Sequence, residues 1–211
     1  AVPAVAWYGI FATNTDVYPE PPNSWADAWD PKFKGALGWN ADIDTNYLLD
    51  IVAVTYFGGQ DILKTRDGLL EVLKKAAELE PNVTLWYHTG AAFEDALRSG
   101  KVTAGQFYQD SIHVIAAEGF PVRSTFPKEG GVLDFGFWCL IQGSTRREAA
   151  YSFINYCSDP AVQSEITRHL GTAPVVPRRL TNLSDKEFLA ASSDKTPIIP
   201  RYDLYVKNGE W

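Results

Sequence analysis

Cysteine, histidine and methionine are scarce in this sequence of 211 residues. It contains two cysteines, three histidines and no methionine. Cys139 and Cys157 form no CxxC pair and have no histidine cluster nearby, which argues against a zinc site. In an exported protein the two could form one disulfide, and two free thiols are an equally good interpretation. We therefore expect no bound metal.

Long apolar runs and catalytic motifs are also absent. No run of 18 apolar residues occurs, so we expect no transmembrane helix and no direct insertion into a membrane. No signal peptide is visible, which is compatible with the periplasm because a mature exported protein has lost it. The sequence has no GxxxxGK[ST], GxGxxG or GxSxG motif, and thus neither a phosphate-binding loop nor a nucleophile elbow. These absences argue against an enzyme and against a cofactor.

Basic residues are the minority among the charged ones. The chain has 26 acidic and 19 basic residues, a formal net charge of -7. Such a surface repels phosphate backbones, so we expect no nucleic-acid partner, and it mildly favours cationic ligands. Aromatic residues make up 13 % of the chain. Core packing accounts for most of them, and the functional interpretation is an aromatic-lined pocket for organic cations or sugars.

Predicted strands alternate with predicted helices along the chain. The nearly continuous apolar run Ala4–Asn14 predicts a strand buried on both faces. Further strands are predicted at Lys34–Trp39, Val83–Tyr87, Val102–Tyr108, Val122–Phe126 and Val132–Ile141. Helices are predicted from Asp42–Thr45 to Phe57 and at Asp67–Leu79, Ala91–Arg98, Ser111–Glu118, Thr145–Tyr156, Pro160–Leu170 and Ser184–Ala191. The alternation predicts an α/β fold with a largely parallel central sheet flanked by helices.

Polar residues follow three of these strands: Asn40–Asp44, His88–Gly90 and Tyr108–Asp110. In open α/β sheets, ligands bind beyond the carboxyl ends of strands, so we expect a small-molecule site there. For Asp42 and Asp44 three interpretations stay open. They could cap the following helix, contact a ligand, or act as paired catalytic carboxylates.

Several motifs resemble those of spermidine/putrescine-type periplasmic solute-binding proteins of ABC importers. Asn23–Gly35 reads NSWADAWDPKFKG and is similar to the SWADLW-P-YKG segment of that family. Pro127–Gly131 reads PKEGG, as in the family. Arg147–Tyr156 and Ser158–Val162 (REAAYSFINY, SDPAV) resemble its FINF helix pair, and Lys207–Trp211 reads KNGEW. The matches keep their order and cover almost the whole chain.

The resemblance implies two α/β lobes joined by crossing strands that close on a ligand. Residues 1–133 and 177–211 would form lobe two with the first crossing strand, and residues 134–176 would form part of lobe one. The family has a long segment before the position of Ala1, so the resemblance implies that most of lobe one is missing here. The rest of lobe one would then expose apolar surface.

The resemblance also implies ligand-binding residues, although it carries over unevenly. Asp42 falls on an acidic residue of the family that contacts a ligand amine, whereas Thr45 falls where the family has glutamate. Tyr108 falls near a stacking tryptophan. Thr89 lies beside Gly90, where the family has a small polar residue.

Two further candidates lie on the crossing strands. After PKEGG the family has a tryptophan and, two positions later, an aspartate. The corresponding residues in this sequence are Asp134 and Gly136. The carboxylate has thus moved two positions towards the N-terminus. Asp134 is expected to pair with a ligand ammonium group. For Trp7, packing in the hinge or core and a floor for the ligand chain both remain open.

We therefore predict the periplasmic solute-binding component of an ABC importer, which passes a small amine-bearing ligand to an inner-membrane permease. The threonine at position 45 favours a ligand with fewer cationic ends. A polyamine such as putrescine or spermidine, and an ω-amino acid such as γ-aminobutyrate, are equally supported. For the latter, N–H groups at the helix start near Thr45 would bind the carboxylate. The alternatives are a carbohydrate hydrolase using Asp42 and Asp134, and a ligand-sensing module for a membrane receptor.

Overall fold

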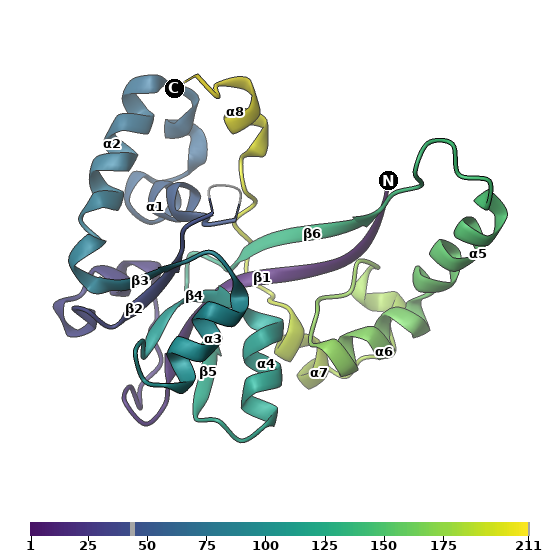
Figure 1. The fold of residues 1–211 in the computed structure, drawn as a ribbon, viewed down its shortest axis with the longest axis horizontal. Coiled ribbons are helices and arrows are strands. Elements are labelled where there is room, and N and C mark those ends of the chain that lie inside the picture. Colours follow the sequence, from purple (N-terminus) through teal and green to yellow (C-terminus); the bar gives the residue numbers. More distant parts are fainter. Residues whose placement is uncertain (43–44, 211) are drawn as a thin grey trace.

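The computed structural model describes residues 1–42 and 45–210 (Figure 1). Asp44, one of the paired carboxylates, and Trp211 of the KNGEW motif lie outside the described residues. The strands are β1 (Val2–Asn14), β2 (Leu37–Asn40), β3 (Val83–Tyr87), β4 (Ala104–Tyr108), β5 (Val122–Thr125) and β6 (Val132–Trp138). The α-helices are α1 (Leu48–Phe57), α2 (Arg66–Ala77), α3 (Gly90–Arg98), α4 (Gln109–Ala117), α5 (Arg147–Cys157), α6 (Pro160–Leu170), α7 (Asp185–Ala191) and α8 (Tyr202–Lys207). Helices flank a central sheet, which confirms the predicted α/β class.

The sheet is mixed. Its strand order is β3-β2-β4-β1-β5, with β6 also paired to β1. The prediction of a largely parallel sheet holds only for β2, which runs parallel to β3 and β4. It is wrong for β1, which pairs antiparallel with β4, β5 and β6. The reason is that β1 enters the body of the molecule and β6 leaves it along the same ribbon, so the two strands must run in opposite directions (Figure 1).

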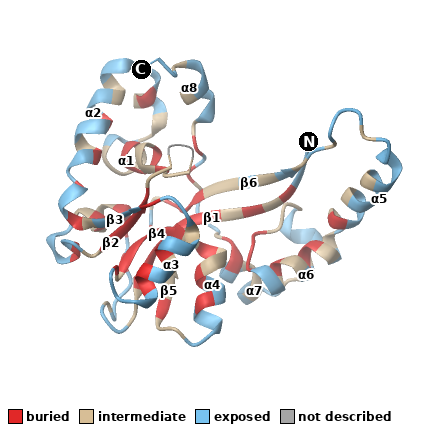
Figure 2. Cartoon of the chain, viewed as in Figure 1, coloured by how far each residue is buried: buried red, intermediate tan, exposed pale blue. Residues whose placement is uncertain are grey.

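Strand β1 is buried on both faces at its inner end, as its apolar sequence predicted (Figure 2). Tyr8 and Ile10 belong to one core, together with Phe93 of α3 and Ile112 of α4. Phe11, on the opposite face, belongs to a second core with Ile51 of α1. Successive side chains of a strand point to opposite faces, so one apolar run serves both cores.

Strands β2 and β4 approach each other closely at a pair of glycines. Gly38 and Gly105 are opposite each other in the register. A Cβ on Gly105 would overlap the carbonyl oxygen of Gly38, and one on Gly38 would lie 2.7 Å from the ring of Phe93. Neither position has room for a side chain, so both glycines are required for the sheet and for α3 to pack on it.

The two most specific motifs contact each other. Ser24 caps a 3₁₀ helix, Trp25–Trp29, in a capping box with Asp27. Both oxygens of Glu129, from the PKEGG motif, accept hydrogen bonds here, from the Ser24 hydroxyl (2.5 Å) and the Trp25 amide (3.1 Å). The Trp25 indole N–H donates to the carbonyl of Gly130 (2.9 Å). The two motifs therefore hold each other in place in the fold.

Replacing Glu129 by alanine is expected to lower the free energy of unfolding by about 2 kcal/mol, since it leaves the buried Ser24 without a charged acceptor. Urea unfolding followed by tryptophan fluorescence measures the change. Glu20→Ala, which removes an exposed carboxylate from a loop, is the matched control and should shift the midpoint little. Equal midpoints for both variants would mean that the two motifs do not stabilise each other.

An arm extends from the body along the β1–β6 ribbon and carries α5 and α6 (Figure 1). Several of its apolar side chains are exposed, among them Phe137, Ile141, Phe153 and Tyr156. The sequence predicted exposed apolar surface in residues 134–176, and this part of the structure has it. Cys139 is exposed and Cys157 is buried; both are free, so the disulfide alternative is not realised.

The C-terminal segment, residues 196–207, returns to the body. Ile198 pairs with Val132 at the start of β6, through hydrogen bonds of 2.9 Å with Leu133 and Gly131. The segment then forms the short helix α8 beside α1 and α2 (Figure 1). The sequence analysis predicted no helix after Ala191, so α8 is a new element.

Candidate functional site

Three strand ends and the crossing ribbon meet at one edge of the sheet. Because β2, β3 and β4 are parallel, all three strands end at this edge, at Asn40, Tyr87 and Tyr108. Strand β1 enters the sheet here, with Gly9 paired to Tyr108, and β6 begins here, with Val132 paired to Gly9. The polar groups that follow the strands are thereby collected beside the ribbon.

Asn40 connects three of the predicted ligand residues. It is only 3 % exposed. Its side-chain N–H groups donate to the hydroxyls of Thr45 (3.0 Å) and Tyr108 (3.2 Å), and its carbonyl accepts from the Asp42 amide (2.8 Å). This buried amide fixes the loop after β2 against the end of β4.

Asp42 pairs with a histidine. Its Oδ1 lies 2.8 Å from Nδ1 of His88, the residue that follows β3, and both side chains are substantially exposed. The interpretation of Asp42 as a cap of the next helix is wrong, because α1 begins only at Leu48 and the Leu48 amide donates to Asn46 (3.0 Å). Asp42 is thus a charged group at the rim of the site.

The helix starts late because Tyr47 adopts a left-handed backbone conformation. Its φ is 54°, uncommon for a residue other than glycine. The buried Tyr47 ring packs on Gly9, where a Cβ would lie 3.2 Å from it. Thr45 therefore lies in a turn, with its amide bonded to the Asp42 carbonyl (3.0 Å). The prediction of a helix start near Thr45 is therefore wrong, because α1 begins at Leu48.

Asp134 is held by three donors. Its Oδ2 accepts from the hydroxyls of Tyr47 (2.9 Å) and Tyr202 (2.6 Å), and its Oδ1 accepts from the Phe135 amide (2.8 Å). The donors come from the start of α1, from α8 and from β6 itself. Asp134 is therefore a half-buried carboxylate in a fixed orientation.

Trp7 lies directly opposite Asp134 on the crossing ribbon. Residues paired across antiparallel strands project to the same face, so the indole and the carboxylate stand side by side. Trp7 is only partly buried, which suits a surface that a ligand can contact.

The phenols around Asp134 remain protonated at neutral pH. Burial, followed by the charge of Asp134, raises the pKa of Tyr47 far above its ordinary value. Burial and the hydrogen bond to Asp134 raise the pKa of Tyr202 in the same way. The pKa of Tyr108 is raised mainly by burial, with smaller contributions from Asp110 and Asp134. All three hydroxyls thus keep their proton, and those of Tyr47 and Tyr202 donate it to Asp134.

Thr89 has a local role. Its hydroxyl accepts from the Ala92 amide (3.3 Å) and so caps α3. The side chain is exposed, and its hydrogen bonds join it to none of the other predicted ligand residues.

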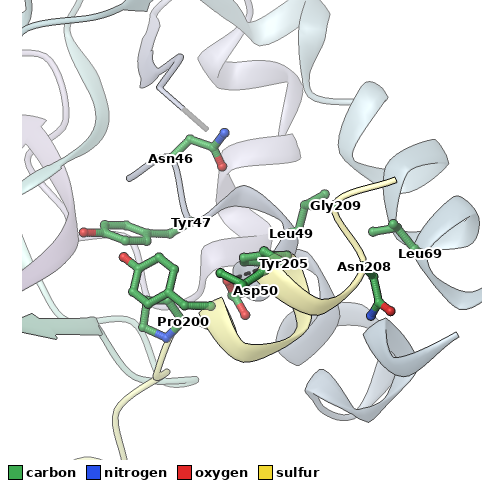
Figure 3. A pocket seen from close by; sticks show the side chains of 11 residues that line it. Asn46, Tyr47, Leu49, Asp50, Leu69, Pro200, Tyr205, Asn208 and Gly209 are labelled. Atoms are coloured by element: carbon green, nitrogen blue, oxygen red, sulfur yellow. Dashed lines mark hydrogen bonds between the residues drawn. The ribbon is translucent and has the colours of Figure 1, made fainter. Parts of the chain in front are cut away.

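A cavity of about 430 Å³ adjoins the site between α1, α2 and α8 (Figure 3). Tyr47 lies at one end and Leu69 of α2 at the other, and Tyr202 also lines it. None of the predicted ligand residues lines this cavity. The tyrosines that hold Asp134 therefore form part of its wall.

Residues 1–191 match the family model of bacterial extracellular solute-binding proteins. The chain belongs to this family. The spermidine/putrescine-binding periplasmic protein of Escherichia coli K12 is 27 % identical over 197 residues, which are 92 % of this chain and 53 % of that protein. The γ-aminobutyric acid-binding protein of Pseudomonas aeruginosa is 25 % identical over 179 residues, 82 % of this chain and 49 % of that protein.

The fold is shared with solved members of this class. The PBP MotA of Agrobacterium tumefaciens B6, crystallised with glucopine, superposes with a TM-score of 0.80 at 21 % identity, over 100 % of this chain and 68 % of that one. The chain spans about half the length of the curated relatives that it matches.

Among the described residues, neither a metal centre nor a membrane-spanning helix is found. Within residues 1–42 and 45–210, no group of three or more His, Cys, Asp or Glu side chains could hold a metal ion. No helix in that part of the chain is long and apolar enough to cross a membrane. The hydrolase alternative finds no support in the relatives, whose names are those of binding proteins.

Four residues that organise the site were not among the predicted ligand-binding residues. Asn40 and His88 were recognised only as polar residues after strands, and Tyr47 was placed inside a helix. A signal did exist for Asn40, because an asparagine directly after a buried strand needs partners for a whole amide group. Nothing local pointed to Tyr202, which lies 68 residues from Asp134.

Proposed function

We propose that this chain is the ligand-binding part of an ABC-importer solute-binding protein, and that it captures a small amine-bearing molecule. The observation that carries the proposal is Asp134, a half-buried carboxylate oriented by two phenols beside Trp7. It lies where the crossing ribbon meets the carboxyl ends of the parallel strands. The names of the relatives, which refer to spermidine, putrescine and γ-aminobutyric acid, support the same ligand class.

The chemistry around Asp134 suits one ammonium group. A carboxylate has about four acceptor positions, and three are taken by the tyrosine hydroxyls and the Phe135 amide. The remaining position, on Oδ1, can accept one charge-assisted N–H bond. The Trp7 indole offers an aromatic face for the cation or for the methylenes next to it.

The other end of the ligand would meet Asp42 and His88. In a polyamine, the second ammonium group would replace His88 as the partner of Asp42. In an ω-amino acid, the carboxylate would accept from His88 and from the Tyr108 hydroxyl. The chemistry of the distal group therefore determines whether it binds Asp42 or binds His88 and Tyr108.

Variants at the rim distinguish the two ligand classes. Asp42→Ala is expected to weaken putrescine binding by about tenfold, since an exposed ion pair is lost from one end of the ligand. His88→Ala should leave putrescine affinity within about threefold and weaken γ-aminobutyrate. Calorimetric titration of both ligands into both variants measures these changes. Equal effects of both substitutions on both ligands would contradict the assignment of the rim to the distal group.

We also propose that the protein acts outside the cytoplasmic membrane, in the periplasm, and hands its ligand to an inner-membrane permease. Binding needs no covalent step, cofactor or metal. The relatives are periplasmic or extracellular binding proteins, and closure of a second lobe would exclude water from Asp134 and strengthen its ion pair. Residues 1–133 and 177–211 would form one lobe and residues 134–176 part of the other.

The experiment is calorimetric titration of putrescine, spermidine and γ-aminobutyrate. Each is titrated into this chain and into a two-lobed form in which a first lobe precedes Ala1. Saturable binding of one of the three to the two-lobed form supports the proposal. Absence of heat with all three, in a protein whose circular dichroism shows it to be folded, would overturn the amine ligand.

A further inference from the structure

A buried carboxylate lies beneath the C-terminal segment. Asp50, on α1, is 1 % exposed. Its Oδ1 accepts from the Gln60 side chain (2.5 Å) and the Arg201 amide (3.2 Å), and its Oδ2 accepts from the Tyr205 hydroxyl (2.7 Å; Figure 3). Two of these three donors belong to the C-terminal segment, so Asp50 is the point where α8 is tied to α1.

Gln60 strengthens the same attachment. Its side-chain N–H groups donate both to Asp50 and to the carbonyl of Ile199 (2.7 Å). Leu204 adds an apolar contact to the core cluster under α1 and α2. The attachment therefore combines one charged acceptor, a bridging amide and one apolar side chain.

Burial of Asp50 is costly, and the C-terminal segment supplies the compensation. Desolvation raises the pKa of Asp50, and the hydrogen bonds from Tyr205, Gln60 and the Arg201 amide counteract part of that rise. A buried carboxylate is tolerated only when its acceptor positions are filled. A buried carboxylate of this kind holds the chain in one arrangement rather than adding stability. A ligand site needs a terminal segment that is held in one arrangement.

The same segment reaches the ligand site. Tyr202 is three residues before Tyr205 on α8, and its hydroxyl donates to Asp134 (2.6 Å). Asp50 itself touches neither Asp134 nor any of the predicted ligand residues through the hydrogen bonds of the described chain. The hydrogen bonds from the Arg201 amide and the Tyr205 hydroxyl connect Asp50 to the site through α8.

We propose that Asp50 is a positioning residue of the ligand site, which acts by fastening the segment that brings Tyr202 to Asp134. The inference rests on the proposed function, because it assigns Asp50 a role in placing the carboxylate that receives the ligand ammonium. It adds a residue to the site that lies behind the ligand and that the ligand does not touch.

Hydrogen exchange tests the attachment without any ligand. Asp50→Leu keeps the number and branching of the side-chain heavy atoms but has no acceptor, and it is expected to reduce the protection of amides 198–206 at least about tenfold while amides of β1 and β4 keep theirs. Asp50→Asn keeps one acceptor oxygen and should stay within about threefold of the unsubstituted chain. Asp203→Leu alters an exposed carboxylate on the same helix and is the matched control. Unchanged protection in Asp50→Leu would overturn the proposal.

Ligand affinity tests the link to Tyr202. Asp50→Leu and Tyr202→Phe are each expected to weaken putrescine or γ-aminobutyrate binding by about tenfold, and the double variant should be no weaker than either single one. Full additivity, or unchanged affinity in Asp50→Leu despite a released segment, would overturn the positioning role. If neither ligand binds the unsubstituted two-lobed protein, the proposed function fails, and the exchange experiment alone decides whether Asp50 fastens the segment.

Discussion

Replacing Asp134 by asparagine is expected to weaken the binding of an amine ligand by about a hundredfold in the two-lobed protein. The substitution removes the charge that an ammonium group pairs with, and loss of one partner of a desolvated charge pair costs several kcal/mol. It also leaves the hydroxyls of Tyr47 and Tyr202 facing a neutral amide. Calorimetric titration of putrescine and γ-aminobutyrate measures the loss.

The size of this effect should depend on charge and not on shape. Asparagine has nearly the same volume as aspartate, so the fold should be preserved. Asp110→Asn is the control, because it changes a carboxylate in the first turn of α4, just beyond the end of β4, to which no ligand contact is assigned. A fall of less than about threefold in Asp134→Asn, or an equal fall in Asp110→Asn, would show that another group binds the ammonium.

Replacing Gly105 by alanine is expected to destabilise the fold by about 3 kcal/mol, the upper end of the usual cost of overpacking. A Cβ at this position would overlap the Gly38 carbonyl on the neighbouring strand, and backbone at the centre of a sheet cannot move aside as a flexible side chain can. For a chain of this length the melting temperature should fall by about 10 °C. Thermal unfolding followed by circular dichroism gives the value.

Gly90→Ala provides the matched comparison for this prediction. A Cβ on Gly90 would make only an ordinary contact, at 3.7 Å from the ring of Phe107, and the residue lies in the first turn of α3. Alanine is the better helix former, so this variant should be as stable as the parent or slightly more stable. Similar melting temperatures for Gly105→Ala and the parent would contradict the close approach of β2 and β4.

The elements that could be predicted are those with a strong local pattern. Helix α6 has the predicted bounds, since proline is favoured at the first position of a helix, and β3 also has the predicted bounds. Strand β1 was identified from one apolar run that serves two cores. The start of α1 was wrong because the left-handed conformation of Tyr47 is stabilised by packing on Gly9, a contact that the local sequence does not contain.

The site was predictable where it depends on strand ends and not where it depends on distant partners. Asn40 and Tyr108 end strands and Asp42 follows one, and the sheet brings them together. The partners of Asp134 were not predictable, since Tyr47 lies 87 residues away. Helix α8 is short and is held by Asp50, 155 residues before Tyr205, so its own sequence gives little sign of it.

The most direct test of an ammonium-binding site compares putrescine with butane-1,4-diol. The two molecules share a four-carbon chain and differ in their charged ends, so they separate recognition of the ammonium group from packing on methylenes. Calorimetric titration of the two-lobed protein should show saturable binding of putrescine at least about a hundredfold tighter than any binding of the diol, with the difference abolished in Asp134→Asn. Equal affinities for the two molecules would contradict the account.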